Sequence, residues 1–286
     1  MNPATIYLSK WPKSRDTHKT MHGALELIVQ VLGGTDVETY PWQELRYETA
    51  RAIPALLADK KNKKGKALAV PTINKSLVAL RGVLESAMRS GQMPNDVYQL
   101  IDIKNVKGKS KKSGRALSVE ETDSILECMP ACSPQEAALI ALLCATGMRR
   151  VELVRLVRED LDWETHRISV KGKGDKVREV PIAPRWLPFI KPWWDELAPE
   201  AVVFTEFNSD KPMSRRTVSY IIETFCSDFK LPRFTPHDLR RTFATRVCEN
   251  ADIGIASTLL GHVSVDTTAL YSRRGKAAED AAVKGV

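Results

Sequence analysis

The length of 286 residues allows one large domain or two of ordinary size, and a hydrophobic content of 43% is enough for a packed core. The net charge of +8 and the isoelectric point near 9.2 favour a polyanionic partner such as nucleic acid over a small neutral substrate. No run approaches the roughly 18 apolar residues of a membrane helix, and the polar first residues lack a signal-peptide core, so we expect a cytoplasmic protein without membrane spans.

The first 103 residues are predicted to form a small helical bundle. Apolar residues recur there at spacings of three and four, which is the pattern of amphipathic helices. Thr72 is a plausible N-cap of the last helix, and Gly91 is a plausible stop signal after it. The segments with this pattern are 18–32, 42–60 and 72–91.

Residues 104–115 form a basic strap that is predicted to link two domains. The strap contains no acidic residue and almost no apolar one, so it is not expected to pack into a core. Such a strap is typical of a solvated linker, and equally of a chain that lies along DNA phosphates. Its basic residues are Lys104, Lys107, Lys109, Lys111, Lys112 and Arg115.

Residues 116–286 are predicted to form a second, mixed domain. Ser118 with Glu121, and Ser133 with Glu136, have the spacing of capping boxes at the start of two helices. Residues 166–182 then alternate apolar and polar side chains around a glycine-rich turn, which predicts a β-hairpin. Short helices are predicted after the hairpin, at residues 214–229, 236–251, 253–261 and 264–272.

The cysteines are expected to be reduced and mostly buried. Their number is odd and no two form the close pair of a zinc site. They are Cys128, Cys132, Cys144, Cys226 and Cys248.

Several charged residues stand where helix structure alone does not require them. Thr146 and Gly147 are predicted to end one helix, which places Arg149 at the start of the next. Glu152 follows three residues later and is expected to hold the Arg149 guanidinium by a charge-assisted hydrogen bond. An arginine at a helix start is common on protein surfaces, so this pair by itself decides nothing.

The segment "PHDLRRTFAT" raises the same question. If Pro236 begins a helix, His237 and Arg240 lie on one face within reach of a common ligand, while Arg241 points elsewhere. A solvated helix start is the alternative explanation.

Two further positions complete the set of candidates. Lys173 projects from the glycine-bracketed turn "GKGDK" of the hairpin, which equally fits a plain solvated turn. His262 follows Gly261 after one helix, and Tyr271 comes nine residues later, where packing is the ordinary role of a tyrosine.

Together these residues resemble the tyrosine recombinase (phage integrase) family, whose active site contains Arg, Lys, His-x-x-Arg, His or Trp, and Tyr in that chain order. Lys171 and Lys176 flank the matched lysine, so its choice rests on the glycine-bracketed alignment. The matching residues are Arg149, Lys173, His237, Arg240, His262 and Tyr271, with Glu152 as the partner of the first arginine.

The resemblance implies a mainly α fold with a small β-sheet: an N-terminal helical core-binding (SAM-like) domain and an α+β catalytic domain. It also implies a site-specific DNA recombinase that cleaves and rejoins strands through a 3′-phosphotyrosyl intermediate and a Holliday junction. No carboxylate cluster accompanies the matched residues, so we expect no metal and no other cofactor. The phosphotyrosyl link conserves the energy of the broken bond, so we expect no need for ATP.

The expected partners are double-stranded recombination sites and further copies of the chain, which would form a homotetramer on DNA alone or with a partner recombinase. The short alanine-rich tail, residues 276–283, is expected to dock on a neighbouring protomer. Within the family, the length favours a Xer-type resolvase or a plasmid or transposon recombinase. We expect such an enzyme to act in the cytoplasm, at the nucleoid. A type IB topoisomerase and a DNA-binding protein without catalysis are the alternatives.

Overall fold

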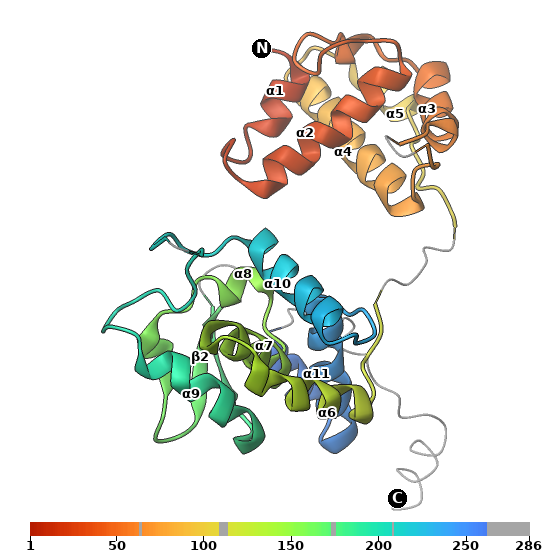
Figure 1. Ribbon diagram of the computed structural model, residues 1–286. Coiled ribbons are helices and arrows are strands. Elements are labelled where there is room, and N and C mark those ends of the chain that lie inside the picture. The colour runs from red at the N-terminus through yellow and green to blue at the C-terminus, as the bar shows by residue number, and fades with distance from the viewer. Residues whose placement is uncertain (63–64, 109–113, 173–175, 208, 262–286) are drawn as a thin grey trace, which may run out of the picture. The chain divides into compact units, whose positions relative to one another are not determined.

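The chain folds into two compact units, residues 1–112 and 113–286 (Figure 1). The division falls inside the predicted basic strap, and the functions assigned to the two domains remain predictions. The computed structural model describes residues 1–62, 65–108, 114–172, 176–207 and 209–261.

The first unit is a helical bundle arranged around one long helix, α4. Its neighbours α1, α2 and α3 pack against α4, and the buried faces form one core. Trp42 is fully buried in this core, where its indole N–H donates to the carbonyl of Val37 at 2.8 Å. The helices are α1 (Pro3–Leu8), α2 (Asp16–Val31), α3 (Tyr47–Asp59), α4 (Val70–Arg89) and α5 (Asn95–Leu100).

Two local predictions for this unit were wrong. The segment 42–60 contains a 3-10 turn, Trp42–Glu44, and the α-helix begins only at Tyr47. Thr72 is not an N-cap, because α4 starts at Val70, with Pro71 in its first turn where a missing N–H costs nothing. Gly91 does follow the end of α4 in the left-handed conformation, with φ of 72°.

The second unit surrounds helix α7, which is apolar on all sides and therefore buried. Helices α9 and α11 pack against it (Figure 1). Both predicted capping boxes are confirmed, at the starts of α6 and α7. The helices are α6 (Val119–Cys128), α7 (Pro134–Thr146), α8 (Arg150–Leu153), α9 (Leu187–Asp195), α10 (Arg215–Asp228), α11 (Pro236–Asn250) and α12 (Ile253–Leu260), with 3-10 turns at Met129–Ala131, Arg158–Asp160 and Pro184–Trp186.

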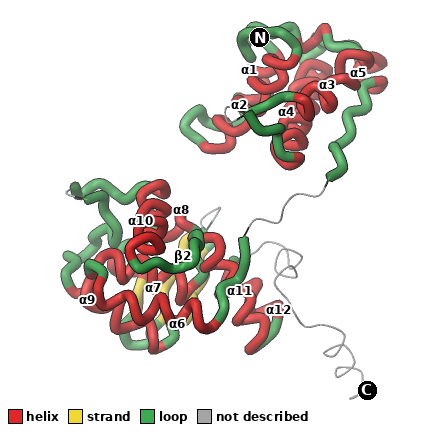
Figure 2. The backbone as a smooth tube through the Cα atoms, turned by 45° about the vertical axis from the view of Figure 1, so that its right-hand side comes forward, coloured by secondary structure: helices red, strands yellow, loops and turns green. Residues whose placement is uncertain are grey.

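A small antiparallel sheet completes the second unit (Figure 2). The predicted hairpin is confirmed as β2 (Arg167–Lys171) and β3 (Val177–Pro181), and Ile168 pairs with Val180 on the buried face. A short strand that the sequence did not indicate, β1 (Leu161–Asp162), pairs with β2. The expected fold class, mainly α with a small sheet, is therefore confirmed.

Residues 262–286 lie outside the described residues, and with them the predicted helix 264–272 and the tail. Within the described ranges, no helix combines the length and the apolar character needed to cross a membrane.

All five cysteines are free thiols, as expected, but only Cys226 and Cys248 are buried, so the prediction of general burial was wrong. Cys132 and Cys144 are partly buried. Their loss of contact with water raises the pKa of Cys132 to about 11 and that of Cys144 to about 12, so both thiols are protonated at neutral pH.

Candidate active site

The turn between α7 and α8 positions the first candidate, Arg149. Gly147 ends α7 in the left-handed conformation, with φ of 58°, and its N–H donates to the Leu143 carbonyl. A Cβ at this position would lie only 2.7 Å from the ring of Phe243, so glycine also permits a close approach of α11. Arg149 follows as the N-cap of α8, as the sequence predicted, and its side chain is 44% exposed.

Glu152 holds Arg149 in two ways. One carboxylate oxygen accepts from the Arg149 guanidinium at 2.9 Å, and the other accepts from the Arg149 backbone N–H at 2.7 Å. The Glu152 side chain is 2% exposed. Burial by itself raises its pKa, but hydrogen bonds from Arg178 and Arg149 outweigh that effect, so the pKa lies below its usual value. Glu152 is therefore an anion at neutral pH.

Arg178, a residue that the sequence reasoning missed, is the second partner of Glu152. Its Nη1 and Nη2 atoms donate to the two carboxylate oxygens at 3.2 and 2.8 Å. Its Nε donates to the carbonyl of Leu259 at 2.8 Å. A signal existed in the sequence: Arg178 stands two residues before the buried Val180 on a strand, and is thus on the inward face of the sheet.

Arg240 is buried, with 4% of its surface exposed. Its two terminal nitrogens donate to the carbonyl of Gly147 at 2.7 Å and to that of Leu260 at 2.8 Å. It therefore joins the turn before Arg149 to the end of α12.

His237 lies one turn before Arg240 on α11 and is exposed. Helix α11 begins at Pro236 as predicted, with a capping box between Thr235 and Asp238. The Asp238 carboxylate also accepts from the backbone N–H of Arg115 at 2.8 Å. Asp238 therefore ties the start of α11 to the segment that leads into the second unit.

The hairpin-turn motif and the motif after α12 each have a glycine close to Glu152 or Arg178. Gly172 opens the turn of the β-hairpin, where a Cβ would lie 3.9 Å from a Glu152 carboxylate oxygen and 3.7 Å from Arg178 Nη1. Gly261 ends α12 in the left-handed conformation, where a Cβ would lie 3.1 Å from the Arg178 side chain. The residues that follow these glycines, Lys173 and His262, lie outside the described residues.

The structure therefore brings together the described parts of all the motifs in the second unit. The turn at Arg149, the start of the hairpin turn, the His-x-x-Arg helix and the end of α12 meet around Glu152, Arg178 and Arg240. Tyr271 lies outside the described part of the chain. Of the lysines that flank Lys173, Lys176 is exposed and Lys171 lies 3.9 Å from Asp160.

The basic strap is more tightly held at its ends than the sequence suggested. The backbone of Val106 exchanges two hydrogen bonds with the Asn74 side chain, at 2.7 and 3.1 Å. Lys104 pairs with Asp102 at 2.9 Å, and Arg115 makes two bonds to the Glu121 carboxylate, at 2.5 and 2.7 Å. Lys107 is exposed, whereas Lys109, Lys111 and Lys112 lie outside the described residues.

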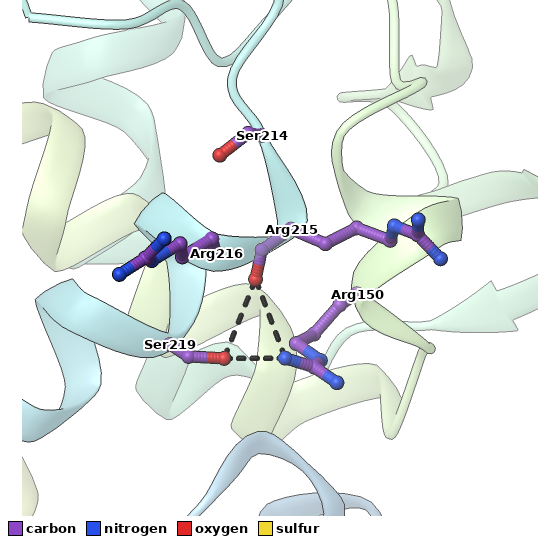
Figure 3. Close-up of a pocket in the computed structure, with 5 residues that line it drawn as sticks. All are labelled: Arg150, Ser214, Arg215, Arg216 and Ser219. Carbon is purple, nitrogen blue, oxygen red and sulfur yellow. Dashed lines mark hydrogen bonds between the residues drawn. The ribbon is translucent and has the colours of Figure 1, made fainter. Parts of the chain in front are cut away.

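A second basic feature, not singled out in the sequence, lies beside Arg149. A pocket of about 510 Å³ between α8 and the start of α10 is lined by three arginines and two serines, with no carboxylate. Arg150 donates to the Ser219 hydroxyl at 2.5 Å, while the side chains of Arg215 and Arg216 point in opposite directions (Figure 3). The lining residues are Arg150, Ser214, Arg215, Arg216 and Ser219.

Comparison with known proteins decides the family. The model of the phage integrase family matches residues 115–277, more than half of the chain. The chain belongs to the phage integrase family. It is 29% identical over 213 residues to tyrosine recombinase XerD of Lacticaseibacillus casei, which covers 70% of this chain and 71% of XerD. The chain is thus a Xer-like tyrosine site-specific recombinase.

Solved structures support the fold. The recombinase superposes on the XerH site-specific recombinase bound to a palindromic difH substrate with a TM-score of 0.72, at 21% identity, over 94% of this chain and 80% of XerH. It superposes on a lambda integrase dimer bound to a COC′ core site with a TM-score of 0.71, at 18% identity, over 96% of this chain and 94% of the integrase chain.

No group of three or more histidine, cysteine or carboxylate side chains suited to a metal occurs in the parts of the chain that the structure describes. The expectation of metal-free chemistry stays a prediction.

Proposed function

We propose that the recombinase cleaves a DNA strand in the site built around Glu152, Arg178 and Arg240. The convergence of the motif segments on these three residues, of which Glu152 and Arg240 are buried and Arg178 nearly so, is the observation that carries the proposal. Arg149 and Arg240 hold the non-bridging oxygens of the scissile phosphate, whose negative charge grows as the nucleophile adds. Planar guanidinium groups suit this task because each offers two parallel N–H donors.

Tyr271 supplies the nucleophile. Its phenol, with an ordinary pKa of about 10, needs a proton acceptor at neutral pH. His237, exposed at the start of α11, is the candidate acceptor, and His262 donates a hydrogen bond to the phosphate or to the attacking oxygen. The phenolic oxygen bonds to phosphorus, the bond to the 5′ oxygen breaks, and Lys173 protonates the departing oxygen. The 3′-phosphotyrosyl bond retains the energy of the phosphodiester, so rejoining needs no ATP.

The substrate is double-stranded DNA, and exchange between two sites proceeds through a Holliday junction in a homotetramer, formed alone or with a partner recombinase. The DNA complexes of XerH and of lambda integrase support the choice of substrate. The helical first unit serves as the core-binding domain, the arginine pocket beside α10 contacts phosphates, and residues 276–283 dock on the next protomer. The cytoplasmic nucleoid is the place of action.

The direct test is covalent trapping of DNA. The purified chain is incubated without metal ions, in EDTA, with nicked duplexes prepared from a genomic fragment library, so that a short product diffuses away after cleavage. DNA that stays bound to protein under denaturing conditions is then recovered and sequenced. We expect one recurrent site with a pseudo-palindromic core. Recovery of no covalent DNA, or trapping only when a divalent metal is added, would overturn the proposal.

Lys173→Ala is expected to cleave ordinary DNA very slowly but to cleave normally a site whose bridging 5′ oxygen is replaced by sulfur. A thiolate leaves without a proton, so the substitution removes the need for a general acid. The measurement is the single-turnover rate on both substrates. Lys171→Ala and Lys176→Ala are the matched controls, and sulfur rescue of either one would move the role to that lysine.

Neutralising the basic strap is expected to weaken specific and non-specific DNA binding alike. The slope of log K against log salt concentration is negative, and each lost phosphate contact should reduce its magnitude by about 0.9. Because Lys104 and Arg115 already pair with carboxylates, changing these two to glutamine should alter the slope less than changing Lys107, Lys109, Lys111 and Lys112. An unchanged slope in both variants, measured by fluorescence anisotropy, would show that the strap is only a linker.

A further inference from the structure

The arginine of strand β3 occupies an unusual place for a charged residue. Arg178 points to the inward face of the sheet and its side chain is 9% exposed. A buried guanidinium is unfavourable unless its donors are paired. All three nitrogens of Arg178 are paired, Nη1 and Nη2 with Glu152 and Nε with the Leu259 carbonyl. The side chain is therefore fixed in one orientation.

Arg178 and Arg149 both donate hydrogen bonds to the Glu152 carboxylate. Each carboxylate oxygen accepts one hydrogen bond from each arginine, counting the Arg149 backbone N–H. Arg149 is 44% exposed, so it is the arginine that faces outward, whereas Arg178 is enclosed. The bidentate contact from Arg178 restrains rotation of the carboxylate, and the carboxylate in turn sets the direction of the Arg149 guanidinium.

Arg178 also binds the end of helix α12. The last carbonyls of a helix have no partner within the helix and carry partial negative charge. Arg178 binds the Leu259 carbonyl and Arg240 binds the Leu260 carbonyl, each at 2.8 Å. The left-handed residue after them, Gly261, lies against the Arg178 side chain. Arg178 therefore contacts both Glu152 and the end of α12.

We propose that Arg178 is a positioning residue of the recombinase. It orients Arg149 through Glu152, and it fixes the position of the end of α12 relative to Arg149. The proposal rests on the proposed function, because it assumes that Arg149 binds the scissile phosphate. Arg178 does not touch that phosphate. Without Arg178 the recombinase still binds DNA, but Arg149 and the end of α12 are held less accurately relative to each other.

The test uses Arg178→Lys, since Arg178→Ala would leave the buried Glu152 short of a cationic partner and risks unfolding the unit. Lysine keeps the charge but cannot make the bidentate contact and the Nε bond together. Arg167→Ala is the matched control, because Arg167 lies on the neighbouring strand β2 and pairs with the exposed Glu179 at 3.3 Å. Circular dichroism and thermal melting establish that each variant is folded.

Cleavage and affinity are measured on a nicked duplex that carries the site recovered by covalent trapping. We expect Arg178→Lys to keep wild-type affinity while its single-turnover cleavage falls about 10-fold to 100-fold, a loss of the size seen when the partner that orients a metal ligand is removed. Arg167→Ala should cleave at the wild-type rate. Wild-type cleavage by a folded Arg178→Lys would overturn the positioning role alone, whereas failure of the wild-type chain to form a covalent complex would overturn the proposed function.

A double-mutant cycle with Glu152→Gln separates positioning from a general structural role. If Arg178 acts through Glu152, the double variant should cleave no more slowly than the slower single variant. Losses that multiply, in proteins with equal affinity for DNA, would show that Arg178 acts independently of Glu152 and would contradict the proposal.

Discussion

Replacing Tyr271 by phenylalanine is expected to abolish covalent complex formation and leave DNA binding at the wild-type level. The change removes one oxygen, the atom that attacks phosphorus, and no other candidate nucleophile among the matched residues can take its place. Binding is measured by gel shift on the trapped site, and cleavage by the covalent band on a denaturing gel with a nicked substrate.

Tyr47→Phe is the control for this change, because Tyr47 has an exposed hydroxyl in the first unit. It should cleave at the wild-type rate. Persistent cleavage by Tyr271→Phe would show that another residue is the nucleophile.

Arg149→Ala and Arg240→Ala should each reduce cleavage by about 100-fold to 1,000-fold, or about 2.7 to 4 kcal/mol of transition-state stabilisation, as when a donor is removed from an oxyanion site. Their effects on folding should differ. Arg149 is 44% exposed and its partner, the buried Glu152, keeps the bidentate contact from Arg178, so Arg149→Ala should lower the free energy of unfolding less than Arg240→Ala does. Arg240 is buried and joins two carbonyls, each bond to a charged donor contributing roughly 1.5 to 3 kcal/mol, so Arg240→Ala should also be less stable.

The measurements are single-turnover cleavage, DNA affinity and urea unfolding for each variant. Arg241→Ala is the matched control on α11, since the Arg241 guanidinium donates to the Gly114 carbonyl. Equal losses of affinity and cleavage in Arg149→Ala and Arg240→Ala would mean that these arginines only hold the DNA backbone.

Features set by near neighbours in the chain could be predicted from the sequence. The capping boxes of α6 and α7, the hairpin and the pairing of Arg149 with Glu152 all depend on residues a few positions apart. Helix α9 was missed because its segment contains Pro192, which argues against a helix when read locally. The short helices α1 and α5 were missed because six residues carry little periodicity, and packing against α4 stabilises both.

The supporting part of the site could not be predicted in the same way. Arg178 bonds to residues 26 and 81 positions away, so only the folded sheet reveals its role. The sequence also suggested that His237 and Arg240 share one ligand-facing surface. In the structure Arg240 is buried and donates to the carbonyls of Gly147 and Leu260, while His237 is exposed. Helical spacing gives a common face but does not show which side chain the neighbouring elements bury.

The account depends most on the identity of the covalently linked residue. Trapped complexes are digested with nuclease and trypsin, and the peptide that carries the nucleotide is sequenced by mass spectrometry. Cleavage after Arg246 and Arg273 yields a peptide in which Tyr271 is the only tyrosine. We predict a nucleotide attached to Tyr271 through its 3′ phosphate, with a free 5′ hydroxyl on the released strand. A nucleotide on any other residue, or a link through a 5′ phosphate, would contradict the account.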